Sequence, residues 1–256
     1  MVFKLNTALV AGLSLALCSS AGAEPLLWQD DFGAEIVELT GLDDAFTEHE
    51  LGVAFPYAGG SYTGGFIGTN GALALGGIGR SFTWPGGNEF INTPDPMVAP
   101  FWSDLSLEAN GRVYQNNLVD RTVFTWENVG SFLRPTASFT FQVQLLDSGT
   151  IIFGYDGMDP IAGNLDLNAY VGVTEGNQSS FPPEVDYSAG VAAAGATVYE
   201  RFDYNPPEVF DLDQSNIIFT PAGSAFAITT ITAIPEPAGV GLSLLGISTL
   251  LTRRRR

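Results

Sequence analysis

The chain has 256 residues, with 28 acidic residues, 10 basic residues and a formal net charge of −18. Lys4 and the four arginines at 253–256 supply five of the basic residues, so residues 24–252 carry 5 − 28 = −23. A field of this sign repels nucleic acid, keeps a protein soluble and attracts cations. Composition therefore argues against a nucleic-acid-binding protein.

The N-terminus has the three parts of a secretion signal. Lys4 makes the start positive, residues 8–17 are apolar, and Ala21 and Ala23 flank a glycine in a small-x-small cleavage site. The apolar run falls short of the roughly 20 residues that span a bilayer, which makes a permanent membrane helix the weaker alternative. We predict a signal peptide with a helical core over residues 1–23, cut after Ala23.

Short segments between turn residues predict an all-β fold for residues 24–233, a single domain resembling an antiparallel β-sandwich. The clearest segment is 138–145, where apolar residues alternate with threonine and glutamine as in a half-buried strand. A turn ending in glycine at 147–149 separates it from the apolar segment 150–155, which predicts a β-hairpin.

A second hairpin is predicted around residues 121–129, which are rich in β-branched and aromatic residues. Residues 111–115 are its expected partner across the turn at 116–120. The sequence of residues 181–214 predicts long loops around one strand. Further strands are predicted at 65–69, 72–75, 169–174, 197–201 and 217–220.

Several short motifs occur in a fixed order between residues 51 and 174. An aromatic segment at 51–57 precedes an Asn-Gly pair, then Ala-Pro-Phe-Trp-Ser-Asp, a tryptophan-containing strand and the hairpin at 139–155. In this order the residues resemble the nidogen-like extracellular domain, called NIDO. The resemblance implies an extracellular β-rich module of matrix and adhesion proteins, without catalytic activity. The residues that carry it include Asn70, Gly71, Pro100, Phe101, Trp102, Asp104 and Trp126.

These motif residues also have plain structural interpretations. The aromatic pair Phe101 and Trp102 favours a core anchor over a ligand platform, because burying each ring stabilises a fold by a few kcal/mol, at roughly 25 cal/mol per Å². The pair Asn70 and Gly71 has the composition of a tight hairpin turn. Asp104 is expected to cap a turn or accept hydrogen bonds from backbone N–H groups.

Acidic loops make calcium the best candidate for a bound ion. Asp156, Asp159, Asn164 and Asp166 offer oxygen ligands on a glycine-containing loop. Calcium takes six to eight oxygens from such loops. Their spacing fits no EF-hand, so solvated loops without a metal are the favoured interpretation and calcium binding is the alternative. A second acidic group comprises Asp203, Asp211 and Asp213.

Residues that catalyse common reactions are scarce. Cys18, the only cysteine, lies inside the signal, so the mature chain has no thiol for catalysis or metal binding. His49 is the only histidine, and no Gly-x-Ser-x-Gly or His-Glu-x-x-His motif surrounds it or any other residue. We therefore predict a surface histidine and a protein that is not an enzyme and needs no cofactor.

The C-terminus resembles a PEP-CTERM sorting tail over residues 234–256. Pro235, Glu236 and Pro237 precede the apolar stretch 238–252 and four terminal arginines. Such a stretch is short for a permanent span, and the arginines hold its end on the cytoplasmic side. The resemblance implies a hydrophobic helix that enters the membrane, processing by an exosortase near the tripeptide, and a Gram-negative envelope rich in exopolysaccharide. A simple tail anchor is the alternative.

These observations predict an exported protein of the cell surface, outer envelope or extracellular matrix, which acts by adhesion. Its expected partners are the secretion machinery, an exosortase, and an exopolysaccharide or matrix protein. One alternative is a carbohydrate-binding module, which an exposed aromatic row such as Trp84 with Tyr62 or Phe90 would favour. Another is a glycoside hydrolase, which needs two carboxylates facing each other in a cleft.

Overall fold

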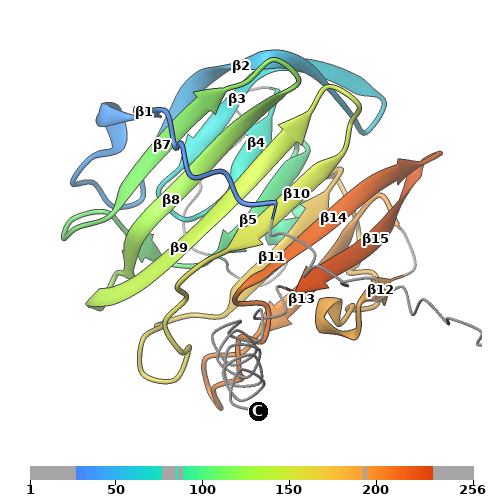
Figure 1. Cartoon of the computed structure of the whole chain (residues 1–256). Coiled ribbons are helices and arrows are strands. Elements are labelled where there is room, and N and C mark those ends of the chain that lie inside the picture. The colour runs from blue at the N-terminus through green and yellow to red at the C-terminus, as the bar shows by residue number, and fades with distance from the viewer. Residues whose placement is uncertain (1–26, 77–84, 86–88, 193–194, 233–256) are drawn as a thin grey trace, which may run out of the picture. The chain divides into compact units, whose positions relative to one another are not determined.

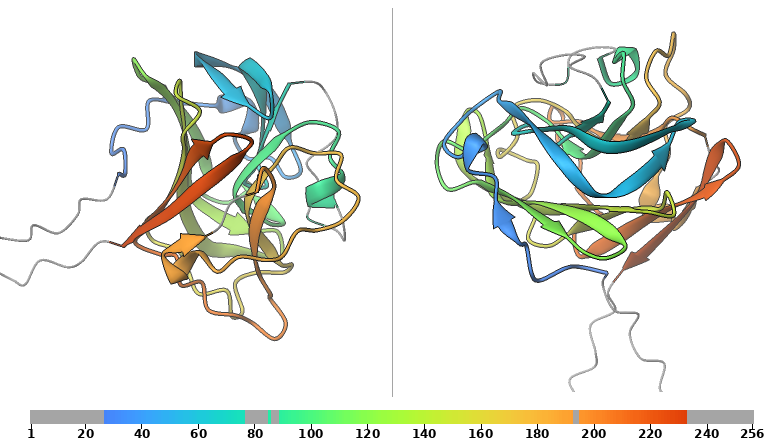
Figure 2. Two further views of the ribbon diagram at one scale, coloured as in Figure 1. Left: turned by 90° about the vertical axis from the view of Figure 1, so that its right-hand side faces the viewer. Right: turned by 90° about the horizontal axis from the view of Figure 1, so that it is seen from above.

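Two antiparallel β-sheets face each other around a shared apolar core (Figures 1 and 2). The computed structural model describes residues 27–76, 85, 89–192 and 195–232, all of which belong to one unit, Glu24–Ala233. The predicted all-β sandwich is confirmed for these residues. The predicted signal and tail helices lie outside them. No helix within the described ranges is long and apolar enough to cross a membrane.

The first sheet has nine strands in the order β1-β7-β8-β9-β10-β14-β15-β12, and β6 pairs with β8 beside this path. Its middle contains both predicted hairpins, with β7 paired to β8 and β9 paired to β10. The strands are β1 (Ala34–Glu35), β6 (Leu105–Ser106), β7 (Arg112–Asn117), β8 (Arg121–Ser131), β9 (Arg134–Leu146), β10 (Ile151–Tyr155), β12 (Val191–Ala192), β14 (Ser215–Ala222) and β15 (Ala225–Thr232).

The second sheet has six strands in the order β13-β11-β5-β4-β3-β2. These are β2 (Phe46–Tyr57), β3 (Gly60–Gly68), β4 (Leu73–Leu75), β5 (Met97–Trp102), β11 (Ala169–Thr174) and β13 (Val198–Phe202). The helices among the described residues have three or four residues each: η1 (Val37–Leu39), α1 (Glu89–Asn92) and η2 (Tyr187–Ala189).

Alternation along β9 builds the centre of the core. Phe139, Phe141, Val143 and Leu145 are fully buried on its inner face, as the pattern predicts. Phe141 stacks on Trp126 of β8, with ring centroids 5.1 Å apart. The indole N–H of Trp126 donates to the Gly68 carbonyl oxygen at 3.0 Å. This hydrogen bond ties the first sheet to the end of β3 in the second.

The outer face of β9 differs from the half-buried strand that the sequence predicts. Gln142 and Gln144 are buried there, because an N-terminal strap, residues 27–32, crosses the first sheet (Figure 1). The Gln142 side chain accepts from the backbone N–H of Gln29 at 3.1 Å and donates to its carbonyl oxygen at 3.1 Å. The side-chain amide of Gln142 thus gives the backbone of Gln29 the two hydrogen bonds that a neighbouring strand would otherwise supply.

An aromatic cluster covers the outer face of the second sheet. Phe101 points into the central core, whereas Trp102, next along β5, joins Phe90, Tyr170 and Tyr199 in this second cluster. Phe90 is 1% exposed and stacks on Tyr170 at 5.9 Å. Phe90 therefore has no free face for the exposed aromatic row that would favour carbohydrate binding, and Trp84 of that row lies outside the described residues.

Candidate functional site

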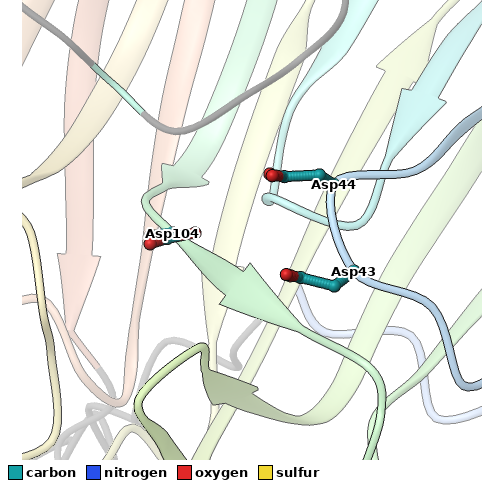
Figure 3. A group of neighbouring side chains, drawn as sticks. All are labelled: Asp43, Asp44 and Asp104. Atoms are coloured by element: carbon teal, nitrogen blue, oxygen red, sulfur yellow. The ribbon is translucent and has the colours of Figure 1, made fainter.

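Three carboxylates from two distant segments meet at one place in the fold (Figure 3). Asp43 and Asp44 lie just before β2, and Asp104 lies in the turn between β5 and β6. One oxygen from each lies within 4.8 Å of the others, and all three side chains are half-buried. We call Asp43, Asp44 and Asp104 the carboxylate group.

Backbone pairing brings the two segments together. Asp43 forms an isolated antiparallel bridge with Ser106 of β6. The backbone N–H of Leu107 donates to the Leu42 carbonyl oxygen at 2.9 Å, which extends this pairing. Asp104 is held from the other side, since its carbonyl oxygen accepts from the backbone N–H of Phe132 at 3.0 Å. Backbone hydrogen bonds to neighbouring strands therefore hold the segments that carry these carboxylates.

The predicted Asn70-Gly71 turn lies against the carboxylate group and is hydrogen-bonded to it. The turn joins β3 to β4 and is buried rather than exposed. The Asn70 amide donates to a carboxylate oxygen of Asp44 at 2.8 Å, and its oxygen accepts from the backbone N–H of Leu105 at 2.8 Å. Gly71 has φ +78°, and a Cβ atom there would collide with the Phe101 carbonyl oxygen. Only glycine fits this position without moving β5.

Electrostatics penalise full ionisation of the group. Burial, and then the charge of Asp44, raises the pKa of Asp43 from 3.8 to about 6. Burial, and then the charges of Asp43, Asp44 and Asp166, raises the pKa of Asp104 to about 6. One buried oxygen of Asp43 accepts no hydrogen bond from any described residue. Either a shared proton or a bound cation would relieve this repulsion.

The chemistry of these donors suits a hard cation. Calcium prefers carboxylate and carbonyl oxygens, and takes six to eight of them. The carboxylate group supplies three charged side chains, of which Asp44 already accepts one hydrogen bond from Asn70. A calcium ion held by Asp43, Asp44 and Asp104 would need carbonyl or water oxygens to complete its shell.

The calcium candidates named from the sequence lie elsewhere and are engaged in loop hydrogen bonds. Asp156 accepts from the Gln214 amide at 2.6 Å, and Asp159 accepts from the backbone N–H of Ser138 at 2.8 Å. Asp166 accepts from the Ser131 hydroxyl and the backbone N–H of Leu133, and the Asn164 amide donates to a carbonyl oxygen. Of these four, only Asp166 is near enough to the carboxylate group to raise the pKa of Asp104.

The other residues singled out from the sequence serve neighbouring parts of the framework. Pro100 lies in β5, where its carbonyl oxygen accepts from the buried Tyr155 hydroxyl at 2.7 Å. His49 lies half-buried on β2 and contacts Gln115 of β7, with 2.8 Å between Nδ1 and Oε1. In the second acidic group, Asp213 accepts from the backbone N–H groups of Gly157 and Met158, while Asp203 pairs with Arg201.

Comparison with protein families matches residues 27–221 to the family described as NIDO related. The match covers well over half of the chain. The chain belongs to the NIDO-related family. The shared region is wider than the predicted core match at 51–174, and includes the strap, Asp43 and Asp44. Neither a curated protein nor a solved structure matches the NIDO-related chain.

The motifs that carry the family resemblance contain Asp104 and Asn70 but not Asp43 and Asp44. No spacing rule links the adjacent aspartates after Gly41-Leu42 to Asp104, which lies 60 positions after Asp44. Only the pairing of residues 42–43 with β6 brings them together. The signal available in the sequence was the local density of acid, which is common on exposed loops as well.

Proposed function

We propose that this NIDO-related chain works outside the cell as a non-enzymatic adhesion module, joining the cell surface to the matrix around it. The observation that carries the proposal is the family match over residues 27–221, since a NIDO-related domain is consistent with an extracellular protein. The rigid two-sheet framework and the net charge of −18 support it, because a charged, well-packed domain stays soluble and attracts cationic partners.

Sorting signals form the second part of the proposal. Residues 1–23 would direct export through the inner membrane and be cut after Ala23. The tail would place its apolar stretch in the membrane until an exosortase acts at Pro235, Glu236 and Pro237. The protein would then remain on the cell surface or in the matrix of a Gram-negative envelope. Residue types and their order at both ends support this route.

Each of the two alternatives needs particular residues in a particular arrangement. The carbohydrate-binding alternative loses Phe90 from its aromatic row, because this ring is buried in the outer cluster. The hydrolase alternative needs two carboxylates about 5–9.5 Å apart across a cleft. The sequence marks no such pair of carboxylates.

Cell attachment tests the proposal. Cells that lack the chain are compared with cells that carry it for retention on their own isolated matrix under flow. We expect attachment to fall without the chain and to recover when the full chain is restored. Equal attachment with and without it would contradict adhesion. Release of reducing sugar ends from the matrix by the purified protein would instead support the hydrolase.

A further inference from the structure

A pocket of about 440 Å³ lies where three hairpin turns meet. The turns join β2 to β3, β9 to β10, and β14 to β15. They contact one another, since a Cβ atom at Gly149 would meet both Pro56 and Pro221 at 3.0–3.3 Å. Tight turns packed on each other give the pocket a fixed shape.

Apolar groups form most of the wall. Pro56 and Pro221 line it together with the rings of Tyr57 and Phe226, whose centroids lie 5.8 Å apart. The Tyr57 hydroxyl donates to the Ala196 carbonyl oxygen at 3.0 Å, which fixes the ring. Ligand pockets commonly combine such apolar walls with a few placed polar groups.

Glu175 is the one carboxylate among the residues that line this pocket. It follows β11, and its backbone N–H donates to the Thr197 hydroxyl at 3.2 Å. One carboxylate oxygen accepts from the Gln178 amide at 3.2 Å. The charge of Glu175 acts on the pocket wall. Burial is the main cause that raises the pKa of Tyr57, and the charge of Glu175 is the second.

Glu175 also lines a neighbouring hollow of about 320 Å³, with Gln178 and Thr197. The carboxylate thus marks the boundary between an apolar pocket and a polar one. In the part of the chain that the structure describes, Glu175 has no ion pair. The four described arginines each pair with another acid: Arg112 with Glu35, Arg121 with Asp120, Arg134 with Asp166, and Arg201 with Asp203.

We propose that the pocket between the three turns binds a basic side chain, lysine or arginine, of a partner polypeptide. The methylene stem packs against the rings and prolines, as long basic side chains do on apolar surfaces, and the charged head reaches Glu175. The net charge of −18 draws such a partner toward the surface. This inference rests on the proposed adhesive function and names the chemistry of its partner.

Titration calorimetry on the purified full chain tests the pocket, at low salt and with capped pentapeptides as probes. One probe has lysine between glycines, and matched probes have norleucine or glutamate in its place. We expect the lysine peptide to bind at least tenfold more tightly than the norleucine peptide, and the glutamate peptide not to bind. Glu175→Gln is expected to weaken lysine binding at least tenfold. Glu38→Gln removes one exposed charge from η1 and is expected to change it less than twofold.

Three results would overturn the inference: no binding of the lysine peptide at millimolar concentration, equal binding of the norleucine peptide, or the same loss in Glu175→Gln as in Glu38→Gln. The adhesive function is judged separately. Cells carrying Glu175→Gln that attach as well as the wild type would overturn the role of the pocket but leave adhesion intact. Lysine-peptide binding without any effect of the chain on attachment would leave the pocket and contradict adhesion.

Discussion

Glu200 of β13 is a carboxylate placed in the interior. The residue is 8% exposed, and one of its carboxylate oxygens accepts from the backbone N–H of Tyr187 at 3.0 Å. Burial is the main cause that raises the pKa of Glu200 from 4.5 to about 8; the charges of Asp211, Asp186 and Glu184 add to it, and the hydrogen bond from Tyr187 opposes it. Because the folded-state pKa exceeds the unfolded one, the stability that this group contributes is present below about pH 4.5 and lost as the pH rises through 8.

Replacing Glu200 by glutamine therefore tests this residue directly. Glutamine keeps an oxygen for the Tyr187 N–H and cannot ionise. We expect Glu200→Gln to raise the free energy of unfolding at pH 8.5 by a few kcal/mol, at about 1.4 kcal/mol per pKa unit, and to change it little at pH 5. Urea unfolding at both pH values measures the difference. A variant that is destabilised equally at both would show that the carboxylate serves another purpose.

Asp43 and Asp104 also have raised pKa values in the folded state, so they too lose their stabilising contribution as the pH rises, but at lower pH than Glu200. With pKa values of about 6, their stabilising contribution is present below about pH 3.8 and lost as the pH rises through 6. At pH 7.5 a cation can replace the missing protons. We expect 10 mM calcium to raise the melting temperature by a few degrees relative to chelator, for a millimolar site in a domain of this size.

Two variants locate the calcium effect. Asp104→Asn is expected to abolish the calcium-dependent rise, because it removes one ligand of the carboxylate group. Asp156→Asn, in the loop that the sequence pointed to, is expected to retain it. An unchanged midpoint of the wild type at millimolar calcium would contradict calcium binding, and a loss in Asp156→Asn alone would place the ion in that loop.

At the scale of elements, the buried turn between β3 and β4 carries the most strongly constrained backbone near the carboxylate group. Gly71 and Gly59 have nearly the same φ, +78° and +77°, but only Gly71 is packed against a neighbouring strand. A Cβ atom at Gly59 would meet nothing within 4 Å. The two glycines therefore separate the effect of backbone conformation from the effect of packing.

We expect Gly59→Ala to cost about 1–2 kcal/mol, the usual penalty for a left-handed residue with a side chain. Gly71→Ala is expected to cost at least about 2 kcal/mol more, because β5 must also move away from the new methyl group. Denaturant midpoints of both variants measure this difference. Equal losses would mean that β5 yields freely and that the turn does not position Asn70.

Predictability from the sequence varied among the elements for physical reasons. The hairpin of β9 and β10 was predicted because its inner face alternates cleanly. Strand β5 was not, since all its residues are buried and Pro100 interrupts the pattern. This proline is accommodated opposite the register shift between Tyr170 and Gly172 of β11. The strap over Gln142 was also missed, because it comes from 113 residues away.

For the whole molecule, the negative charge and the all-β fold were predictable from the sequence, whereas the sorting route stays a prediction and the candidate site was only partly predictable. Asp104 and Asn70 stood within recognisable motifs, whereas Asp43 and Asp44 joined them through tertiary pairing alone. The pocket between the three turns has the same origin, since Tyr57 and Phe226 lie at opposite ends of the domain sequence. Contacts between distant segments of this kind leave no local pattern for a sequence to reveal.

The measurement that tests the central claim most directly is the location of the protein in its cells, with and without the tail. Cytoplasm, envelope, matrix and medium are separated, and the chain is quantified in each. We expect the full chain, cut after Ala23, on the surface or in the matrix, and a chain ending at residue 233 largely in the medium. Recovery of both chains in the cytoplasm, with residues 1–23 still attached, would contradict an exported adhesion protein.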